Sequence, residues 1–403
     1  MSVAFCAGLE DMMIYSDFQG EKLSLLGFGA MRLPVDAQQR VDEAQVQQMV
    51  DMAIAGGVNY FDTAYPYHGG QSERVLGRAL ARHPRESFCL ADKYPGHQIS
   101  AKYDPAATFE EQLKRCGVDY FDFYLMHNVY GNSLQTYLDP RWGIMDYFIE
   151  QKRLGRIRHL GFSTHGSLDC IETFLKKYGE HLEFCQIQLN YLDWTLQDAK
   201  AKVELLNKYN IPIWVMEPLR GGKLANLSDA DLAKLESHAP GMAATDWAFR
   251  WLQGVPGVTV ILSGMSSLEQ MQKNIATFDA RKPLSEVQTA ALMELAEGMK
   301  NSVPCTSCRY CCEGCPKGLN IPALLAHYND FRFAQSFNVV MAIESLAEGK
   351  TPADCIACGK CARTCPQGID IPEALRAFTE KLTTLPSWAE LCRQREEAQK
   401  RNQ

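Results

Sequence analysis

Hydrophobic and polar residues alternate between residues 23 and 277 in a regular pattern of short apolar runs and longer amphipathic stretches. The apolar runs are bounded by Gly, Pro, Asn or Asp, as strands commonly are, and stretches such as 42–57 and 72–83 have helical spacing. The runs with the length of buried strands are 23–30, 58–64, 88–94, 120–128, 157–164, 184–191, 211–218 and 258–265.

Eight strand–helix units in about 250 residues predict an α/β fold, a parallel (β/α)8 TIM barrel over residues 13–282. A doubly wound open sheet would alternate in the same way, but no G-x-G-x-x-G sequence follows the first strand. In a barrel the carboxyl ends of all strands meet on one face, where the catalytic residues of such folds lie. The polar residues that end these strands are therefore the candidates for chemistry.

The chain of 403 residues is too long for one ordinary domain, and its composition changes near residue 300. We expect a linking helix over 283–300 and a small, mainly helical second domain over 301–380. Residues 381–403 are expected to form a C-terminal helix and a charged, frayed tail. Residues 1–12 precede the first barrel element and are expected to be an N-terminal extension.

The composition is that of a protein with a sizeable core, because 46% of the residues are hydrophobic and 22% are charged. A net charge of −7 argues against general nucleic-acid binding, which depends on Lys and Arg at the phosphates. No apolar run approaches the ~20 residues that cross a bilayer, and the N-terminus lacks the features of a secretory signal. We therefore expect a cytoplasmic protein that binds neither membranes nor nucleic acid.

Nine of the 15 cysteines lie between residues 305 and 365. In a reducing cytosol such a dense block indicates metal ligation rather than disulfides. Two segments, 305–316 and 355–366, each fit C-x2-C-x2-C-x3-C-P, the spacing of bacterial [4Fe–4S] ferredoxins. Zinc also binds C-x2-C pairs, but two complete copies of the longer pattern favour iron–sulfur clusters.

Together these segments resemble the two-cluster ferredoxins that have a helical insertion between the motifs. In that arrangement the fourth cysteine of each motif ligates the other cluster. We therefore expect two [4Fe–4S] clusters in a ferredoxin-like domain, with Cys312 as a surplus cysteine. The predicted ligands are Cys305, Cys308, Cys311 and Cys365 for one cluster, and Cys355, Cys358, Cys361 and Cys315 for the other.

Four polar side chains stand at the ends of three consecutive predicted strands. Asp62 and Tyr67 follow the second strand, Lys93 ends the third and His127 the fourth. Taken singly, Asp62 could cap a helix and Lys93 could be a charge at the rim. Together they suit proton transfer, because a lysine cation lowers a tyrosine pKa towards working pH and an aspartate keeps that lysine charged. A neutral histidine could then hydrogen-bond a carbonyl oxygen.

The segment D-T-A-Y-P-Y-H-G-G-Q-S-E (62–73), followed by Lys93 and His127, closely resembles the aldo-keto reductases. These enzymes are (β/α)8 barrels that reduce carbonyls with NADPH, and the resemblance covers the predicted barrel. It implies that Tyr67 is the proton donor, that the aspartate–lysine pair tunes it, and that His127 orients the substrate. His68 stands where that family usually has Gly, and two extra glycines follow, which predicts a loop of different shape.

The resemblance also implies NADP(H) or NAD(H) at the ends of the last four strands. Thr164 replaces an Asn, and Met216 replaces an aromatic residue that often stacks on the nicotinamide. The family commonly carries Lys and Arg for the 2′-phosphate; neither stands there, and Arg220 or Lys273 could substitute. The residues that map to cofactor contacts are Ser163, Thr164, Gln186, Met216, Pro218, Leu219, Gly221, Ser263, Gly264, Gln270 and Asn274.

Two functions are compatible with these features. The first is an oxidoreductase that reduces a small aldehyde or ketone with a nicotinamide nucleotide and is coupled to, or regulated by, the clusters. A redox partner of ferredoxin or flavodoxin type would then exchange electrons with the clusters, since each cluster passes one electron and a hydride carries two. The second is an electron-transfer or redox-sensing adaptor whose barrel binds nucleotide with little carbonyl reductase activity.

Overall fold

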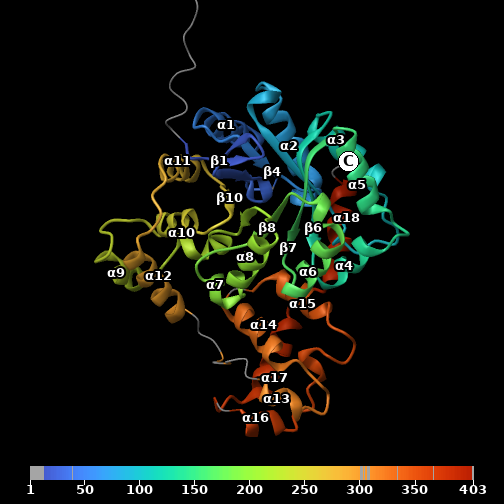
Figure 1. Cartoon of the computed structure of the whole chain (residues 1–403), viewed down its shortest axis with the longest axis vertical. Helices are drawn as coiled ribbons and strands as arrows, with labels where there is room; N and C mark the ends of the chain where they lie inside the picture. The colour runs from blue at the N-terminus through green and yellow to red at the C-terminus, as the bar shows by residue number, and fades with distance from the viewer. Residues whose placement is uncertain are drawn as a thin grey trace, which may run out of the picture.

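The computed structural model of the chain describes residues 13–38, 40–299, 303, 305, 309–333, 335–365 and 367–401. These residues form two bodies, a large barrel and a smaller helical domain that lies below it in Figure 1. The expected N-terminal extension over 1–12 lies outside the described residues and stays a prediction.

Eight parallel strands close into a barrel in the order β10-β3-β4-β5-β6-β7-β8-β9 (Figure 1). The ring closes because β10 pairs with both β9 and β3. Each strand coincides with one of the eight apolar runs, which confirms the predicted (β/α)8 fold. The strands are β3 (Leu26–Gly29), β4 (Tyr60–Asp62), β5 (Cys89–Tyr94), β6 (Phe121–Val129), β7 (Ile157–Thr164), β8 (Phe184–Gln188), β9 (Ile213–Met216) and β10 (Val258–Ser263).

Amphipathic helices return the chain from strand to strand and cover the outside of the barrel. Their starts follow ordinary capping chemistry, since the Asp42 and Asp104 carboxylates each accept a backbone N–H of the first turn. The helices are α1 (Glu43–Ala55), α2 (Gln71–Leu80), α3 (Pro105–Cys116), α4 (Gly131–Leu138), α5 (Ile144–Arg153), α6 (Leu168–Tyr178), α7 (Asp193–Leu196), α8 (Ala199–Lys208), α9 (Asp229–Glu236), α10 (Ala244–Gln253), α11 (Leu268–Thr277) and α12 (Glu286–Met299). Short 3-10 helices are η1 (Ala30–Arg32), η2 (Tyr67–Gly70), η3 (Arg85–Ser87), η4 (Gly179–His181), η5 (Arg220–Ala225) and η6 (Pro352–Asp354).

An antiparallel hairpin of β1 (Tyr15–Phe18) and β2 (Glu21–Ser24) precedes the barrel. The apolar run 23–30, predicted as one strand, is therefore divided between β2 and β3. Phe18 and Leu23 pack against inward-pointing side chains of the barrel, which include Phe123 and Trp214. Because the hairpin leads directly into the start of β3, it fills the end of the barrel opposite the carboxyl ends of the strands.

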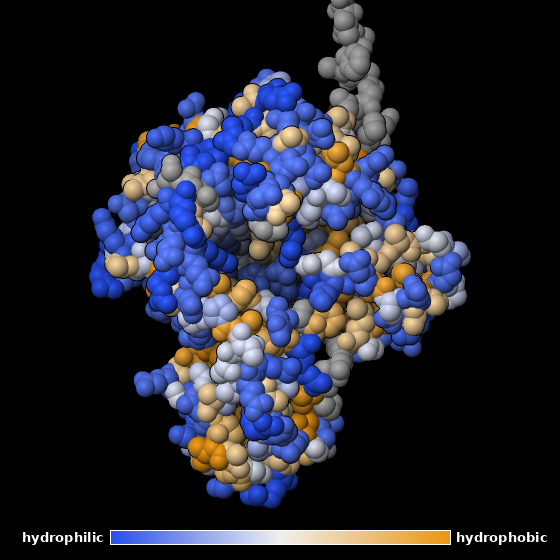
Figure 2. All heavy atoms as spheres, turned by 180° about the vertical axis from the view of Figure 1, so that it is seen from behind, coloured by the Kyte–Doolittle hydropathy of each residue, from blue (hydrophilic) through white to orange (hydrophobic). Residues whose placement is uncertain are grey.

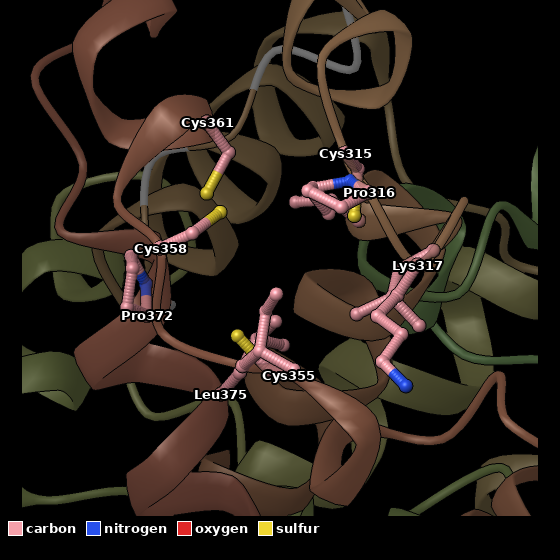
Figure 3. A pocket seen from close by; sticks show the side chains of 11 residues that line it. Cys315, Pro316, Lys317, Cys355, Cys358, Cys361, Pro372 and Leu375 are labelled. Carbon is pink, nitrogen blue, oxygen red and sulfur yellow. The ribbon is translucent and has the colours of Figure 1, made fainter.

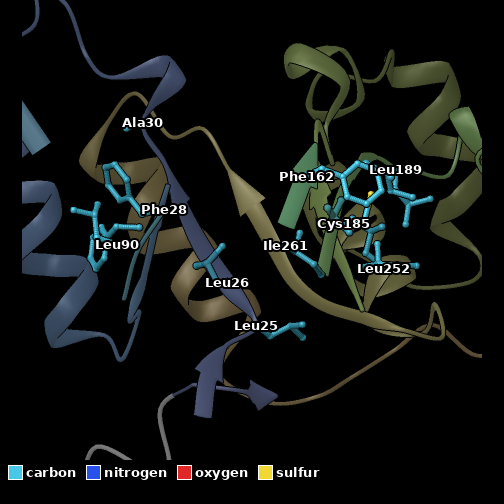
Figure 4. Close-up of a cluster of buried hydrophobic side chains, with 14 of the residues drawn as sticks. Leu25, Leu26, Phe28, Ala30, Leu90, Phe162, Cys185, Leu189, Leu252 and Ile261 are labelled. Atoms are coloured by element: carbon cyan, nitrogen blue, oxygen red, sulfur yellow. The ribbon is translucent and has the colours of Figure 1, made fainter. Parts of the chain in front are cut away.

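The larger core lies between the strands and the surrounding helices. Figure 4 shows Phe28 and Leu90 together on one side of the barrel, and Phe162, Cys185 and Leu189 together on another. All five side chains are fully buried. Burial of apolar surface on this scale holds the strands rigidly, so side chains at the strand ends sit on a fixed frame.

The C-terminal domain consists of two similar halves with an inserted helix. In each half a short helix lies within the cysteine motif and a long helix follows it. Arg309 and Gly359, at matching positions before the short helices, both have positive φ, 66° and 68°. The helices are α13 (Tyr310–Glu313) and α14 (Ile321–Phe333) in the first half, α15 (Phe337–Glu344) in the insertion, and α16 (Lys360–Thr364) and α17 (Ile371–Leu382) in the second.

The last helix, α18 (Trp388–Arg401), runs from the cluster domain back onto the barrel beside β6 and α4 (Figure 1). Helices α14 and α15 face the barrel, whereas α13 and α16 lie at the far end of the domain. The prediction of a frayed tail is wrong for the described residues, because α18 continues to Arg401 and the Gln399 side chain is buried. Its exposed residues include the charged Arg393, Glu397 and Lys400.

The surface seen from behind is mostly hydrophilic over the barrel and is hollowed above the cluster domain (Figure 2). Ile356 of the cluster domain, next to the second cysteine motif, is 56% exposed. Within the described parts of the chain, no helix combines the length and the apolar character that crossing a membrane would need.

Candidate active site and cluster domain

Asp62 and Lys93 form a buried ion pair at the ends of the neighbouring strands β4 and β5. The strands pair with Asp62 opposite Ala91, so the Lys93 side chain reaches across to the Asp62 carboxylate. The Lys93 ammonium also donates to the Thr63 carbonyl oxygen at 2.7 Å. Burial opposes the charged form of Lys93, but Asp62, Tyr67 and Asp92 together outweigh this effect and the pKa of the lysine is raised. The site therefore contains a permanent cation.

Tyr67 begins η2, the turn that follows β4, and its ring lies close to this ion pair. The Lys93 Nζ is 5.1 Å from the centre of the Tyr67 ring. Burial raises the pKa of the Tyr67 phenol above its ordinary value, and the Lys93 charge lowers it by less. The sequence predicted that Lys93 lowers the pKa of Tyr67. This prediction is wrong for the net shift, because burial raises the pKa by more than the Lys93 charge lowers it. At neutral pH Tyr67 keeps its proton.

His127, near the end of β6, faces Tyr67 edge to face, with ring centres 6.0 Å apart. Burial and the neighbouring His97 and Lys93 lower the pKa of His127 well below its ordinary value, so its imidazole is neutral. Its Nδ1 has no hydrogen-bond partner among the described residues. His97, which no sequence motif singled out, lies with its ring centre 4.3 Å away and donates from Nδ1 to the His127 carbonyl oxygen at 2.7 Å.

The structure thus brings together all four residues proposed from the strand ends. A protonated phenol beside a lysine cation can give its proton to an oxygen, and the cation stabilises the phenolate that remains. In the loop after Tyr67, His68 has a φ of 50°, and its Nε2 accepts from the Leu33 N–H at 3.2 Å. This contact fixes the turn that carries Tyr67 to the loop after β3.

Two buried side chains at the ends of β7 and β8 carry oxygen atoms without hydrogen-bond partners in the described chain, Ser163 Oγ and Gln186 Oε1. Gln188 also has an unpaired oxygen, but its amide nitrogen donates to Asp193 Oδ2 at 2.8 Å. Unpaired buried polar atoms cost free energy. Ser163 and Gln186 therefore fit a polar group of a bound ligand, such as a carboxamide.

The other predicted nucleotide contacts of these strands are bonded within the chain. The Thr164 hydroxyl donates to a β6 carbonyl oxygen at 2.6 Å and accepts a backbone N–H at 2.9 Å. Ser263 Oγ accepts from Asn274 Nδ2 at 2.9 Å, and Gln270 Oε1 accepts a backbone N–H at 2.7 Å. Met216 ends β9 and is half-buried. Thr164 therefore has no hydroxyl donor left for a ligand.

The predicted loop that covers a pyrophosphate runs from Pro218 and Leu219 into η5. Gly221 has a φ of 66°, a left-handed conformation that favours glycine. A Cβ on Gly221 would lie 3.2 Å from Arg32 Nη2, and a Cβ on Gly264 would lie 3.3 Å from the stem of the same side chain. Arg32, an exposed residue that sequence reasoning missed, therefore places a cation between the two segments predicted to bind the nucleotide.

Arg220 and Lys273, suggested by the sequence as partners of a 2′-phosphate, are both engaged elsewhere. Arg220 is buried and pairs with Asp193 at 3.2 Å and with Asp330 of α14. Lys273 is exposed and pairs with Glu269 at 2.7 Å. Arg220 joins the barrel to the cluster domain through these carboxylates, and its buried Nη1 has no hydrogen-bond partner among the described residues.

Replacing Asp330 by Asn should loosen the cluster domain from the barrel. The buried Arg220 guanidinium would keep one carboxylate instead of two, at a cost of about 1–3 kcal/mol. Amide hydrogen exchange in α14 and η5 should become about tenfold faster or more. The matched variant Asp231→Asn removes an exposed pair with Lys234 and should change exchange little. If the amides of α14 exchange equally slowly in Asp330→Asn and Asp231→Asn, this role of Asp330 is contradicted.

Four cysteine side chains line one cavity of the cluster domain, and they come from both motifs (Figure 3). Cys315 of the first motif lines this cavity together with Cys355, Cys358 and Cys361 of the second. This is the grouping expected when the fourth cysteine of one motif serves the other cluster. Leu375 of α17 lies against the same cavity, so the surrounding wall is largely apolar.

Within the described residues, no three His, Cys, Asp or Glu side chains lie close enough together to hold a single metal ion. Of the ligands predicted for the other cluster, Cys305, Cys311 and Cys365 belong to the described chain and pack with the core of this domain. Cys308 lies outside the described residues.

Comparison with known proteins identifies both parts of the chain. The aldo/keto reductase family matches residues 25–297, and a 4Fe-4S dicluster domain matches residues 304–369. The NADH-specific methylglyoxal reductase of Escherichia coli is 26% identical over 287 residues, which cover 60% of this chain and 85% of that protein. L-galactose dehydrogenase of Arabidopsis thaliana is 28% identical over 311 residues, which cover 70% and 93%.

Solved structures agree on the fold of the barrel. The aldo-keto reductase AKR11C1 from Bacillus halodurans, in its holo form, has a TM-score of 0.58 and 24% identity, covering 70% of this chain and 96% of that one. An aldo/keto reductase from Klebsiella pneumoniae in complex with NADP and acetate has a TM-score of 0.56 and 22% identity, covering 69% and 93%. The fold and the two-part organisation predicted from the sequence are thus confirmed.

Proposed function

The chain belongs to the aldo/keto reductase family, and on this basis we propose that it reduces the carbonyl group of a small aldehyde or ketone with NADPH or NADH. It is an oxidoreductase of that family whose C-terminal region matches 4Fe-4S dicluster domains. The observation that carries the proposal is the meeting of Asp62, Lys93, Tyr67 and His127 at the carboxyl ends of β4, β5 and β6.

Reduced nicotinamide, when bound, supplies a hydride to the carbonyl carbon. The Tyr67 phenol, which keeps its proton at neutral pH because burial raises its pKa, donates that proton to the carbonyl oxygen. The Lys93 cation, held by Asp62, then stabilises the phenolate until a proton from solvent restores the phenol. The neutral His127 orients the substrate by donating a hydrogen bond to the same oxygen.

Residues at the ends of β7 to β10 would hold the nucleotide. The unpaired buried oxygens of Ser163 and Gln186 suit the nicotinamide carboxamide, whose N–H groups need acceptors. Arg32, between Gly221 and Gly264, is the cation that would face the phosphates, in place of the engaged Arg220. Thr164 would shape the strand end without contacting the carboxamide.

The cluster domain would hold two [4Fe–4S] clusters with the exchanged ligand sets predicted from the motifs. Ile321 lines the cluster cavity and Asp330 pairs with Arg220 beside the nucleotide loop, so α14 spans about 14 Å between the two sites. This helix is the structural basis for coupling or regulation by the clusters. The exposed Cys358 comes two residues before α16, the helix at the end of the domain away from the barrel (Figure 1), where a ferredoxin or flavodoxin type partner could exchange electrons. Thiolate ligands of this kind are consistent with a reducing compartment, and this supports a location in the cytoplasm.

Anaerobic incubation of the holoprotein with NADPH or NADH and a panel of aldehydes and ketones tests this function. One alcohol should form for each nucleotide oxidised. The alternative, an electron-transfer or redox-sensing adaptor, is favoured only by the exposed cluster end of the molecule. It predicts nucleotide oxidation with a one-electron acceptor present and no alcohol from any carbonyl, which would overturn the proposal.

The rate of carbonyl reduction should be nearly independent of pH between about 6 and 8, the range in which an ordinary histidine titrates. Burial lowers the pKa of His127 well below that range and that of His97 to about 3, so both rings stay neutral. The phenol of Tyr67 stays protonated, since burial raises its pKa, and the rate should fall only in the alkaline range. A pH profile of kcat with an ionisation near 6.5 would contradict this assignment.

A further inference from the structure

Helix α18 lies across the barrel with one face directed at the candidate active site. Trp388, Cys392, Arg395 and Gln399 follow one another at intervals of four, three and four residues, which places them on one side of an α-helix. Trp388, Cys392 and Gln399 are buried against neighbouring elements. The fourth member of this face, Arg395, is half-buried.

Both ends of this face are fixed to loops that surround the site. At one end, Trp388 Nε1 donates to the His97 carbonyl oxygen at 3.1 Å, in the loop after β5. At the other end, Gln399 Nε2 donates to the Tyr65 carbonyl oxygen at 3.1 Å, and its Cγ lies 3.4 Å from the position of a Cβ on Gly70. Tyr65 and Gly70 flank the turn that carries the proton donor. Arg395, between the two anchors, therefore faces the gap between these loops.

A continuous set of rings connects Arg395 with the reacting group. The Arg395 guanidinium lies 4.8 Å from the centre of the Trp388 ring, and Trp388 lies 5.7 Å from His97. His97 lies 4.3 Å from His127, which in turn lies 6.0 Å from Tyr67. The charge of Arg395 also acts to lower the pKa of Tyr67, although burial raises it overall. The guanidinium thus lies on the side of the site where His127 and Tyr67 would contact the substrate.

Arg395 differs from two buried arginines of the barrel, each of which pairs with carboxylates. Arg115 pairs with Glu73 at 2.8 Å, and Arg220 pairs with Asp193 at 3.2 Å. No hydrogen bond or ion pair joins the Arg395 guanidinium to any other described residue. The guanidinium packs over the Trp388 ring, but no carboxylate pairs with it among the described residues, so it can still accept an anionic partner.

The Glu344 carboxylate, which also lies against α18, is not the missing partner. It accepts from the Trp388 N–H at 3.0 and 3.2 Å. The nucleotide phosphates are also excluded, because the segments that would hold them come from β7 to β10, whereas α18 is anchored to the loops after β4 and β5. The anion that completes the site must therefore arrive with the substrate.

We propose that Arg395 is a substrate-binding residue and that the substrates are aldehydes or ketones that also carry a carboxylate. The planar guanidinium can donate two parallel hydrogen bonds to a carboxylate, which suits a fixed orientation of the substrate. The carboxylate is unchanged in the reaction: the carbonyl carbon gains a hydride and the carbonyl oxygen gains a proton. The inference rests on the proposed carbonyl reductase function and names its substrate class.

Pairs of aldehydes that differ only in charge test this assignment on the anaerobic holoprotein. Suitable pairs are 4-formylbenzoate with its methyl ester, and 4-oxobutanoate with its methyl ester. Wild type should prefer each carboxylate, and Arg395→Gln should lose about 10–100-fold in kcat/KM for the carboxylates, mainly through KM, as expected for a charge-assisted contact. The esters should be affected little, and Arg395→Lys should recover part of the loss. Arg393→Gln, an exposed position on the same helix, is the matched control.

Two outcomes separate this inference from the proposed function. If wild type reduces each ester as well as its carboxylate and Arg395→Gln changes neither, the substrate assignment is wrong while the reductase function stands. If no carbonyl is reduced, the reductase function fails. Calorimetric titration with the product 4-(hydroxymethyl)benzoate then shows whether Arg395 still contributes to binding a carboxylate. Equal affinity of wild type and Arg395→Gln for that anion would then overturn the role of Arg395.

Discussion

Replacing Tyr67 by Phe should lower kcat for carbonyl reduction by about 10²–10⁴-fold or more, the range typical of general acid catalysis. The variant keeps the ring against His127 and over the Lys93 cation and removes only the hydroxyl that donates the proton. Nucleotide affinity should stay nearly unchanged, because the nucleotide contacts come from other strands. Steady-state kinetics and a nucleotide titration on the same anaerobic preparation measure both effects.

Tyr65→Phe is the matched control, because it removes a phenolic hydroxyl from the same segment. The Tyr65 hydroxyl donates to Glu111 Oε2 at 2.9 Å and takes no part in the proposed chemistry. Lys93 is a poorer target, since its removal would leave the Asp62 carboxylate buried without its cation. If Tyr67→Phe reduces carbonyls as fast as Tyr65→Phe, another group supplies the proton and the tetrad assignment is wrong.

Replacing Cys315 by Ser should remove the cluster held by Cys355, Cys358 and Cys361 and spare the cluster held by its own motif. The four thiols line one cavity, so the loss of one of them opens a corner of the cluster bound there (Figure 3). Iron and acid-labile sulfide should fall from about eight of each per chain towards about four. Iron and sulfide analysis after anaerobic purification is the measurement.

Cys312→Ser provides the control for this prediction, because Cys312 lies in α13, three residues before Cys315, but does not line the cavity. The Cys312→Ser variant should contain as much iron per chain as the wild type. A full complement of iron in Cys315→Ser, or a loss of iron in Cys312→Ser, would show that the ligand sets are drawn differently. Stoichiometric zinc with little iron in the wild type would refute the clusters altogether.

The barrel could be predicted closely because its signals are local. Each strand is an apolar run bounded by turn residues, and the burial of both faces of a parallel strand makes the run continuous. The β1–β2 hairpin escaped prediction because its strands are only four residues long and the second adjoins β3. The convergence of Asp62, Lys93 and His127 followed from the closure of the barrel, which places successive strand ends side by side.

The remaining parts of the site depend on contacts between distant segments, which no local pattern reveals. Arg220 pairs with Asp330, 110 positions later, and Trp388 bonds to His97, 291 positions earlier. The direction in which the pKa of Tyr67 shifts could not be predicted from the sequence either, because it depends on how deeply the phenol is buried. A C-terminal helix was expected, but its continuation to Arg401 was not, since the buried face of this charged segment is marked only by Trp388, Cys392 and Gln399.

Isotope transfer from the nucleotide tests most directly the claim that the barrel reduces carbonyls by hydride transfer rather than relaying electrons to the clusters. The holoprotein would be incubated anaerobically with an aldehyde that it reduces and with NADPH or NADH deuterated at both C4 positions. Direct transfer predicts one deuterium on the carbinol carbon of the alcohol, and none there when unlabelled nucleotide is used in deuterium oxide. A carbon-bound hydrogen drawn from solvent would mean that the electrons travel separately from the proton, and would contradict the account.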